Sequence, residues 1–305
     1  MNSAAGPPGG SGVGTVWAGL KLGRHPRIMG VLNVTPDSFS DGGDFADPDA
    51  AIAAGLAMAV SGADIIDVGG ETTRPRSQPT SPAEEQRRIL PVIRGLAGAG
   101  LRVSVDSRNA ATMAAALGAG AAIVNDVSAL GYDPAAASLV AARGCPVVLM
   151  HMRGTPEDMH TLAHYDDVAA DVTRELGQRI EAAMRAGIPR NRIVVDPGIG
   201  FAKTAAQSLQ LLQRLPELGT LGCHILVGVS RKSFLGAITG EQDPRRRLPA
   251  SLAAGLFALS GGAAILRVHD VPETVQAVKV WQALTEKSAS IGTASPATSG
   301  STPQA

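Results

Sequence analysis

Short runs of apolar residues recur along the chain, and each is followed by polar residues or glycine and then by a helix-like segment. The runs are continuously apolar and do not alternate with polar residues, which is typical of parallel strands covered on both faces. Eight such runs occur, at residues 28–33, 63–69, 102–106, 122–126, 146–150, 192–196, 224–229 and 264–268. The pattern therefore predicts eight parallel strands joined by helices.

The segments between these runs carry signals for helix starts. Asp47 precedes Pro48 and Ser81 precedes Pro82, so a capping side chain stands before a proline at the first helical position. The apolar residues at 168, 172, 176, 180 and 184 predict one helix stripe. Eight strand–helix units in about 260 residues match the size and order of an eight-stranded β/α (TIM) barrel, which is the fold we expect.

A doubly wound open sheet is the alternative fold. It would usually have fewer strands and a glycine-rich GxGxxG loop after its first strand. Here the first run ends in Asn-Val-Thr-Pro at residues 33–36, which is not that loop. We expect a single barrel domain over residues 26–287, between disordered tails rich in glycine, proline and serine at 1–25 and 288–305.

Composition and charge narrow the class of protein. Apolar residues make up 45% of the 305-residue chain, enough for a large core, and 27 basic residues balance 27 acidic ones. A neutral chain lacks the positive field that holds nucleic acid or anionic membranes, so we expect neither as a partner. The one compact basic run, Arg245 to Arg247, is interpreted as a solvated helix start.

The chain also has features of a cytoplasmic protein. Its two cysteines, Cys145 and Cys223, lack the spacing of a zinc site and are interpreted as reduced core residues. The apolar stretches are broken well before the ~20 residues of a membrane span. Residues 1–14 lack the basic start and apolar middle of a secretory signal.

Polar side chains stand at the ends of nearly all the predicted strands. In a TIM barrel these ends meet at the face that carries the active site. A single one of them would be explained by capping a helix, but charges left unpaired in a partly dry mouth cost several kcal/mol, so the whole set indicates a binding site. The residues are Asn33, Asp67, Glu71, Asp106, Asn125, Asp126, His151, Asp196, Ser230, Lys232, Arg267 and His269.

Three of these residues supply carboxylate and amide groups. They are Asp106, Asn125 and Asp196, and each stands at or next to the end of a predicted strand. Such groups suit a flat heterocycle rich in N–H donors, for example an aminopyrimidinone edge.

Another group offers positive charge. Lys232, Arg267 and His269 suit an anionic group such as a phosphate or diphosphate. Asn33 adds a neutral oxygen for a Mg²⁺ ion carried by that phosphate. The combination predicts a substrate with a heteroaromatic head and a phosphorylated tail.

Two long polar loops follow the first two predicted strands. Residues 35–43 contain one aromatic residue, Phe39, and residues 70–76 contain two arginines beside Pro75. Because both loops follow barrel strands, they overhang the mouth, and we expect them to close over the reactants and exclude water.

Seven motifs, taken in order, resemble those of the dihydropteroate synthase family of pterin-binding TIM barrels. The resemblance spans roughly residues 27 to 285, and its motifs coincide with the predicted strand ends. The motifs are NVTPDSFSDGG at 33–43, DVGGETTRP at 67–75, SVDS at 104–107, NDV at 125–127, DPGIGFAK at 196–203, SRKSF at 230–234 and RVHD at 267–270.

The resemblance implies an enzyme of folate biosynthesis. It would join a 7,8-dihydropterin carrying a methyl diphosphate to 4-aminobenzoate, giving 7,8-dihydropteroate and diphosphate by a dissociative substitution. Membership of the family also implies Mg²⁺, a homodimer and sensitivity to sulfonamides, since Thr73–Arg74–Pro75 is retained. The catalytic residues would be Lys232, Asp106, Asp196, Arg267 and His269.

The same resemblance assigns residues to each part of the substrates. The pterin would be held by Asp106, Asn125, Met150, Asp196, Phe201 and Lys232. The 4-aminobenzoate would be held by Phe39, Thr73, Arg74, Pro75 and Ser233. The diphosphate would be held by Asn33, Arg267 and His269, with Asn33 also bound to Mg²⁺.

Some features leave the assignment open. Many relatives carry Gly-Ala after the Thr-Arg-Pro, where this chain has Arg76–Ser77–Gln78, which adds a positive charge beside the aminobenzoate site. His151 is interpreted as a structural or supporting residue, and Lys203 as either a loop charge or a site residue. Two alternatives are a methyltetrahydrofolate-dependent methyltransferase, which shares the acidic pterin pocket, and a non-catalytic paralogue that binds pterin.

Overall fold

Eight parallel strands form a closed barrel in the order β10-β3-β4-β5-β6-β7-β8-β9. The computed structural model describes residues 16–23, 25–35, 47–72 and 79–285. The barrel strands are β3 (Arg27–Asn33), β4 (Ile65–Gly69), β5 (Val103–Asp106), β6 (Ile123–Asp126), β7 (Val147–Met150), β8 (Ile193–Asp196), β9 (His224–Val227) and β10 (Ala263–Val268). The predicted TIM barrel is confirmed, and each strand begins and ends within two residues of the predicted run.

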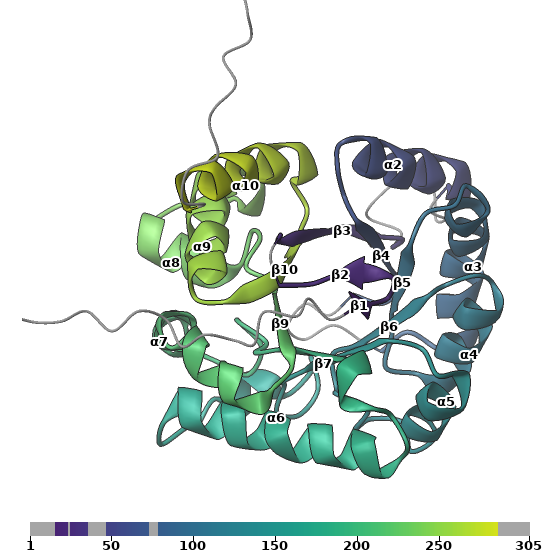
Figure 1. The fold of residues 1–305 in the computed structure, drawn as a ribbon, viewed down its shortest axis with the longest axis horizontal. Coiled ribbons are helices and arrows are strands. Elements are labelled where there is room, and N and C mark those ends of the chain that lie inside the picture. Colours follow the sequence, from purple (N-terminus) through teal and green to yellow (C-terminus); the bar gives the residue numbers. More distant parts are fainter. Residues whose placement is uncertain (1–15, 24, 36–46, 73–78, 286–305) are drawn as a thin grey trace, which may run out of the picture.

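Helices surround the barrel as an outer ring, as the view down the barrel shows (Figure 1). They are α2 (Pro48–Val60), α3 (Pro82–Gly98), α4 (Ala110–Gly118), α5 (Ala136–Arg143), α6 (Val168–Arg185), α7 (Ala205–Gln213), α8 (Ser233–Thr239), α9 (Leu248–Ser260) and α10 (Val271–Thr285). The predicted caps are confirmed, since Asp47 accepts from the Asp49 amide at 2.9 Å and Ser81 from the Glu84 amide at 3.3 Å. The predicted stripe of α6 is buried except for Met184, because Ala183 occupies the buried position in the last turn.

Two hydrophobic clusters make up the core. The larger lies between the barrel and the helices, and it contains Val68, Val105 and Leu149 from the outward faces of strands. The smaller fills the barrel itself, with Met29, Ile65 and other side chains that are fully buried. Side chains alternate along each strand between these two clusters, so the polar residues at the strand ends share the interior face with the smaller cluster.

A short hairpin, β1 (Val16–Trp17) and β2 (Leu20–Lys21), lies inside the ring of barrel strands in Figure 1. Trp17 is 1% exposed, belongs to the cluster inside the barrel, and donates from Nε1 to the Arg192 carbonyl at 2.9 Å. Arg192 directly precedes β8, so the hairpin closes the end of the barrel opposite the strand exits. The predicted disorder of residues 1–25 is therefore wrong for 16–22; residues 1–15 and 286–305 lie outside the described residues.

The strand register brings the predicted site residues to one rim. Asn33 is opposite Gly69, Gly69 is opposite Asp106, and Asp106 is opposite Asn125. Farther along the rim, Met150 is opposite Asp196. Of the helices that the structure describes, none is long and apolar enough to cross a membrane.

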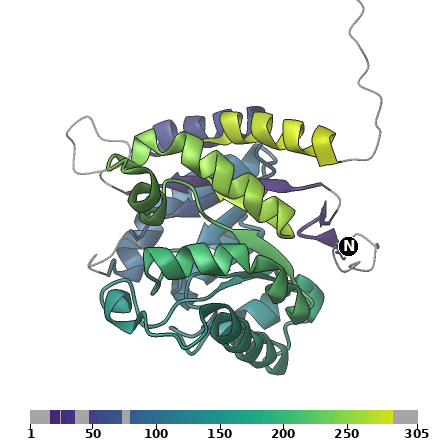
Figure 2. The same ribbon diagram turned by 90° about the vertical axis from the view of Figure 1, so that its left-hand side faces the viewer.

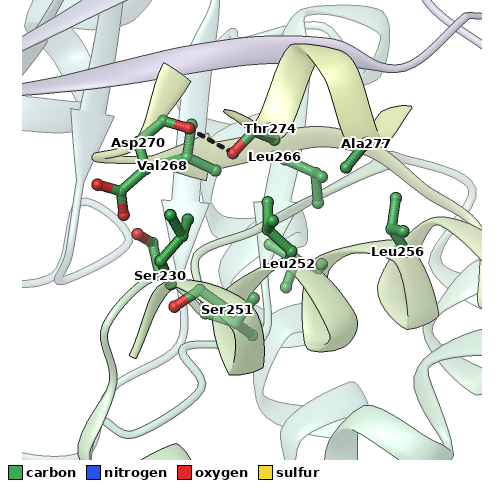
Figure 3. A pocket seen from close by; sticks show the side chains of 13 residues that line it. Ser230, Ser251, Leu252, Leu256, Leu266, Val268, Asp270, Thr274 and Ala277 are labelled. Carbon is green, nitrogen blue, oxygen red and sulfur yellow. Dashed lines mark hydrogen bonds between the residues drawn. The ribbon is translucent and has the colours of Figure 1, made fainter. Parts of the chain in front are cut away.

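A small cavity of about 10 Å³ lies between the barrel and its last two helices. It is lined by Leu252 and Leu256 of α9, Leu266 and Val268 of β10, and Ala277 of α10, among others (Figure 3). From the side, α9 and α10 (green to yellow) run along the outside of the barrel (Figure 2). Ser230, Ser251, Asp270 and Thr274 line its other end, and its volume is at the lower limit for one water molecule.

Gly255→Ala is expected to stabilise the protein by filling this space. A Cβ at Gly255, in α9, would meet Leu266 Cδ1 at 3.4 Å, an ordinary contact, and alanine is favoured over glycine in a helix by about 1 kcal/mol. Thermal unfolding followed by circular dichroism should show a midpoint about 2–4 °C higher. Gly55→Ala in α2 is the control, since its Cβ would lie 2.7 Å from Leu96 Cδ2 and should lower the midpoint. A lower midpoint for Gly255→Ala would contradict the packing described.

Candidate active site

An arginine ties together two carboxylates at the centre of the barrel mouth. Arg267 on β10 donates from Nε to Asp67 Oδ2 at 2.7 Å and from Nη2 to Asp106 Oδ2 at 2.6 Å. Asn125 on β6 donates from Nδ2 to the same Asp67 oxygen at 2.9 Å. Residues from four strands, β4, β5, β6 and β10, therefore meet in one hydrogen-bonded cluster, which is what the sequence analysis required of the strand-end residues.

Asp67 belongs to the predicted set of residues at the strand ends, but no role toward the substrates was predicted for it. It is fully buried on β4, and its Oδ1 has no hydrogen-bond partner in the described part of the chain. Asp126, in contrast, accepts from the amides of Ser128 and Leu130 and thus shapes the turn after β6. The signal for Asp67 was a carboxylate two residues before the end of an otherwise apolar strand, where its side chain must face the barrel interior.

Burial changes the ionisation of Asp106. The pKa of Asp106 is raised to about 7. Desolvation is the main cause, the charge of Asp67 adds to the rise, and the charge of Arg267 opposes it. The ion pair with Arg267 therefore opposes a strong tendency of Asp106 to hold a proton. A carboxyl group whose pKa is shifted to near neutral pH is characteristic of a functional site.

Lys232 and Asp196 are two further charged residues of the mouth, and the charge of each acts on the pKa of the other. Lys232 Nζ lies 3.9 Å from the centre of the Phe201 ring, and Asp196 Oδ1 accepts from the Gly198 amide at 2.8 Å. Burial lowers the pKa of Lys232 to about 8, while the charge of Asp196 raises it. Burial raises the pKa of Asp196, and hydrogen bonding from Gly198 and the charge of Lys232 lower it.

The turn after β8 is held from below by Lys203. This buried lysine donates to the carbonyls of Gly198 and Phe201 at 3.0 and 2.9 Å and contacts His151 Nδ1 at 3.0 Å. His151 Nε2 in turn lies 2.9 Å from Glu175 Oε2. Gly198 is required because a Cβ there would lie 1.9 Å from the His151 carbonyl oxygen. His151 thus supports the site, as predicted, and Lys203 positions the turn that carries Asp196 and Phe201.

His269 is positioned by Ser230. Ser230 Oγ lies 3.0 Å from His269 Nδ1 and accepts from the His269 amide at 3.2 Å. Burial, followed by the charges of Arg231 and Arg267, lowers the pKa of His269 to about 4. The lowered pKa favours a neutral imidazole near pH 7, which serves as a hydrogen-bonding group in this state of the site. The role of His269 toward the diphosphate stays a prediction.

The aminobenzoate residues are mostly beyond what the structure describes. Phe39, Thr73, Arg74 and Pro75 lie outside the described residues, as do residues 76–78, so those predictions stay open. Ser233 is exposed at the start of α8, next in the chain to Lys232.

The base of the second loop is anchored by an ion pair. Glu71 Oε1 accepts from Arg108 Nη2 at 3.0 Å and from the Thr80 amide at 3.1 Å. The Arg108 guanidinium lies 4.1 Å from the centre of the Tyr132 ring. The bond from the Thr80 amide to Glu71 joins the two ends of the segment that contains the predicted aminobenzoate residues. The buried ion pair with Arg108 holds Glu71 in place.

The protein side chains alone do not form a metal cage. Among the described residues there is no group of three or more His, Cys, Asp or Glu side chains that could hold a metal ion. Asn33 ends β3 beside the rim and is partly exposed. One neutral oxygen of this kind fits a Mg²⁺ ion that keeps most of its water and phosphate ligands.

The fold and this mouth match a family of pterin-binding enzymes. The family model described as pterin binding enzyme matches residues 29–269. A dihydropteroate synthase from Synechocystis is 42% identical, with 86% of this chain and 91% of the relative covered. A probable bifunctional folylpolyglutamate synthase/dihydropteroate synthase from Haloferax volcanii is 50% identical over 83% of this chain, but the match spans only 30% of that longer relative.

Solved structures give the same result. Dihydropteroate synthase from Xanthomonas albilineans in complex with 7,8-dihydropteroate is 48% identical, with a TM-score of 0.78 over 85% of this chain and 94% of that one. The Yersinia pestis dihydropteroate synthase in a sulfonamide drug complex is 42% identical, with a TM-score of 0.82 over 87% and 97% of the two chains. The chain belongs to the pterin-binding enzymes and, among them, to the dihydropteroate synthase family. The methyltransferase alternative has no support in these relatives.

Asp67→Asn tests the central cluster through stability. Asp67 is the fully buried one of the two carboxylates that neutralise Arg267, and its loss should lower the free energy of unfolding by about 3 kcal/mol. Asp64→Asn is the control, because Asp64 also pairs with an arginine, Arg27 at 2.9 Å, but in a partly exposed position worth about 1 kcal/mol or less. Denaturant unfolding should separate the two variants clearly. Equal losses would argue that Asp67 does not compensate Arg267 as described.

Proposed function

We propose that the chain joins a 7,8-dihydropterin-6-ylmethyl diphosphate to 4-aminobenzoate, giving 7,8-dihydropteroate and diphosphate for folate biosynthesis. The observation that carries this proposal is the cluster of Asp106, Asn125 and Arg267 around Asp67 at the rim where β8 ends in Asp196. Lys232 lies close enough for the charges of Asp106, Asp196 and Arg267 to act on its pKa. This arrangement offers acceptors for a flat heterocycle beside cations for an anionic leaving group. The family membership supports the same reaction.

The pterin head fits the acidic side of the mouth. Asp196 offers a carboxylate to the N–H groups of the aminopyrimidinone, Asn125 offers both a donor and an acceptor, and Lys232 donates to a ring oxygen or nitrogen. Met150, the strand partner of Asp196, is buried, and Phe201 lies against Lys232 Nζ. These two apolar side chains suit the faces and edge of a flat ring.

The chemistry needs a stabilised cation and no covalent enzyme intermediate. The C–O bond to the diphosphate breaks first, and its electron pair leaves with the diphosphate. The resulting methylene cation is spread over the electron-rich reduced pterin, and the carboxylates of Asp106 and Asp196 favour it electrostatically. The arylamine nitrogen then bonds to the methylene carbon and loses a proton to solvent. A weak nucleophile of this kind suits a dissociative path.

The diphosphate fits the basic side. Arg267 and Lys232 supply positive charge, and His269 supplies a neutral hydrogen bond whose direction is set by Ser230. Asn33 is the residue we assign to Mg²⁺, whose role when bound is to neutralise charge on the leaving diphosphate. Before substrate arrives, the bond from Arg267 Nη2 to Asp106 holds the guanidinium within the cluster.

The assembly and location follow from surface and thiol chemistry. The helices α9 and α10 pack together and expose Phe257, Val280 and Leu284, which are 50%, 61% and 81% exposed. Large apolar side chains at such exposure favour a contact with a second copy of the chain, so we propose a homodimer through these helices. The free thiols of Cys145 and Cys223 fit a reducing compartment, and we propose a cytoplasmic enzyme.

Lys232→Ala tests the assignment of the lysine. We expect turnover to fall by more than about 100-fold, as for the loss of one positioned electrostatic group in other enzymes, with little change in the thermal midpoint. Diphosphate release is the measurement, and it should require both the pterin diphosphate and 4-aminobenzoate. Lys279→Ala, an exposed lysine of α10, is the control and should leave turnover unchanged. Turnover in Lys232→Ala close to that of the original protein would remove Lys232 from the mechanism, and no diphosphate release by the unchanged protein would favour the non-catalytic paralogue.

The pH dependence of kcat/KM for the pterin diphosphate should be bell-shaped. The proposed mechanism needs Asp106 ionised, and its raised pKa of about 7 makes activity rise as pH increases through 7. It also needs Lys232 protonated, and its lowered pKa of about 8 makes activity fall as pH increases through 8. Lys232→Arg should remove the alkaline limb while keeping the acid limb. A profile that is flat from pH 6 to 9 would contradict these two roles.

Sulfonamides should inhibit the enzyme competitively with 4-aminobenzoate. The two compounds share a para-aminophenyl group, and a related enzyme is solved as a sulfonamide drug complex. Steady-state rates at several 4-aminobenzoate concentrations would show the inhibition relieved by excess substrate. Full activity in a large excess of sulfamethoxazole would argue against a family-like aminobenzoate site.

A further inference from the structure

Arg247 ends the basic run 245–247 but does not behave like its neighbours. The side chains of Arg245 and Arg246 are 84% and 74% exposed, whereas Arg247 is 8% exposed. The interpretation of the run as a solvated helix start is therefore right for the first two arginines and wrong for the third. A buried guanidinium needs its charge and its donors satisfied, and those partners reveal its role.

Three backbone carbonyls surround the Arg247 guanidinium. Nε donates to Glu241 at 2.9 Å, Nη2 donates to Gln242 at 2.7 Å, and Nη1 donates to Arg231 at 3.1 Å. Within the described chain, no carboxylate forms an ion pair with Arg247. The planar guanidinium thus joins the loop after α8 to the turn between β9 and α8. The compact ammonium group of a lysine would not match three carbonyls spaced in this way.

The turn held by Arg247 is strained. Arg231 has a φ of 60°, a left-handed conformation that non-glycine residues keep only where their surroundings determine it. Its amide donates to Ser251 Oγ at 2.9 Å, and its guanidinium pairs with Asp270, with Nε donating at 3.1 Å to Oδ2. The amide, the carbonyl and the side chain of Arg231 are therefore all fixed by residues that follow the turn in the chain.

The strained residue lies between two members of the active site. Ser230 on one side contacts His269, and Lys232 on the other lies over the Phe201 ring. A change of the Arg231 backbone would therefore move both neighbours, because consecutive residues of a tight turn share their peptide planes.

Gly236 gives independent support for the closeness of this contact. A Cβ at Gly236, in α8, would lie 2.6 Å from the Glu241 carbonyl oxygen and 2.8 Å from both Nε and Nη2 of Arg247. The helix therefore leaves room at this position for the guanidinium. Any side chain there would force Arg247 and its bound carbonyls apart.

We propose that Arg247 is a positioning residue for the reaction: by bonding the Arg231 carbonyl it holds the strained turn that places Lys232 against Phe201 and within reach of Asp196. This inference rests on the proposed role of Lys232 in binding the pterin. Arg247 acts through Lys232 and contacts no substrate itself. The run Arg245 to Arg247 thus combines two solvent-facing arginines with one that determines the geometry of the mouth.

The first test compares Arg247→Met with Arg246→Met. Methionine keeps much of the apolar stem of Arg247 but loses all three donors, and the expected fall in kcat/KM for the pterin diphosphate is about 10- to 100-fold, the range for a small misplacement of a reacting group. Assays are made at a temperature where circular dichroism shows both variants fully folded. Arg246→Met, which removes a 74% exposed arginine from the same run, should stay within about twofold of the original enzyme.

The pH profile separates positioning from general destabilisation. Lys232 is faced by Asp196 of β8, Asp106 of β5 and Arg267 of β10, and burial is the main reason for its lowered pKa of about 8. If Arg247→Met releases the turn, Lys232 becomes more hydrated, and the alkaline limb should move up toward the ordinary lysine value near 10. A loss of folded protein would instead lower activity by the same factor at every pH and leave the alkaline limb at the same pH.

Two further variants keep the test decisive if Arg247→Met folds poorly. Gly236→Ala retains the guanidinium but displaces it, so it should lower kcat/KM and move the alkaline limb in the same direction. Arg247→Lys restores one donor group and should recover part of the activity. A normal profile with normal kcat/KM in Gly236→Ala, or a fall in Arg247→Met without a shift of the limb, would overturn the inference. If Lys232→Ala is itself fully active, the proposed role of Lys232 fails; if only the Arg247 variants are normal, the positioning inference alone fails.

Discussion

The rest of the site depends on the guanidinium of Arg267, which bridges Asp67 and Asp106 across the mouth of the barrel. Both carboxylates are removed from water, and two such charges so close together would repel each other without a cation between them. The bridge also fixes Asn125, which donates to the same oxygen of Asp67. One ion pair network therefore determines the positions of groups from β4, β5, β6 and β10.

This network explains how the mouth can receive a cationic reaction centre. Arg267 and Lys232 offset part of the negative charge on the acidic side before substrate binds. The diphosphate brings negative charge toward those two cations and toward Asn33, and the developing cation on the pterin takes over their role beside Asp106 and Asp196. Charge compensation thus passes from side chains to substrate as the bond breaks, which is how a preorganised site avoids the cost of reorienting water.

The barrel was predictable from sequence because its strands are continuous apolar runs and its helices carry local caps. The site residues were predictable as a set, since parallel strands must end at one rim. Three features were not. Trp17 belongs to a strand of only two residues, too short to show a strand pattern, and its burial depends on a barrel interior made by eight distant strands. Asp67 and Arg247 have local sequences that suit capping or solvent, and their roles come from partners up to 200 residues away.

The hairpin β1–β2 affects the polar groups at the opposite end of the barrel. Trp17, Leu20 and Leu22 form an apolar floor of the barrel, and the polar groups at the rim lie above a cluster of buried apolar side chains. The low polarity beneath them contributes to the lowered pKa of Lys232, about 8, and to the raised pKa of Asp106, about 7. A shortened chain beginning at residue 26, the boundary that hydrophobic periodicity indicates, would lose this floor. It would keep every motif of the family and yet admit solvent from underneath.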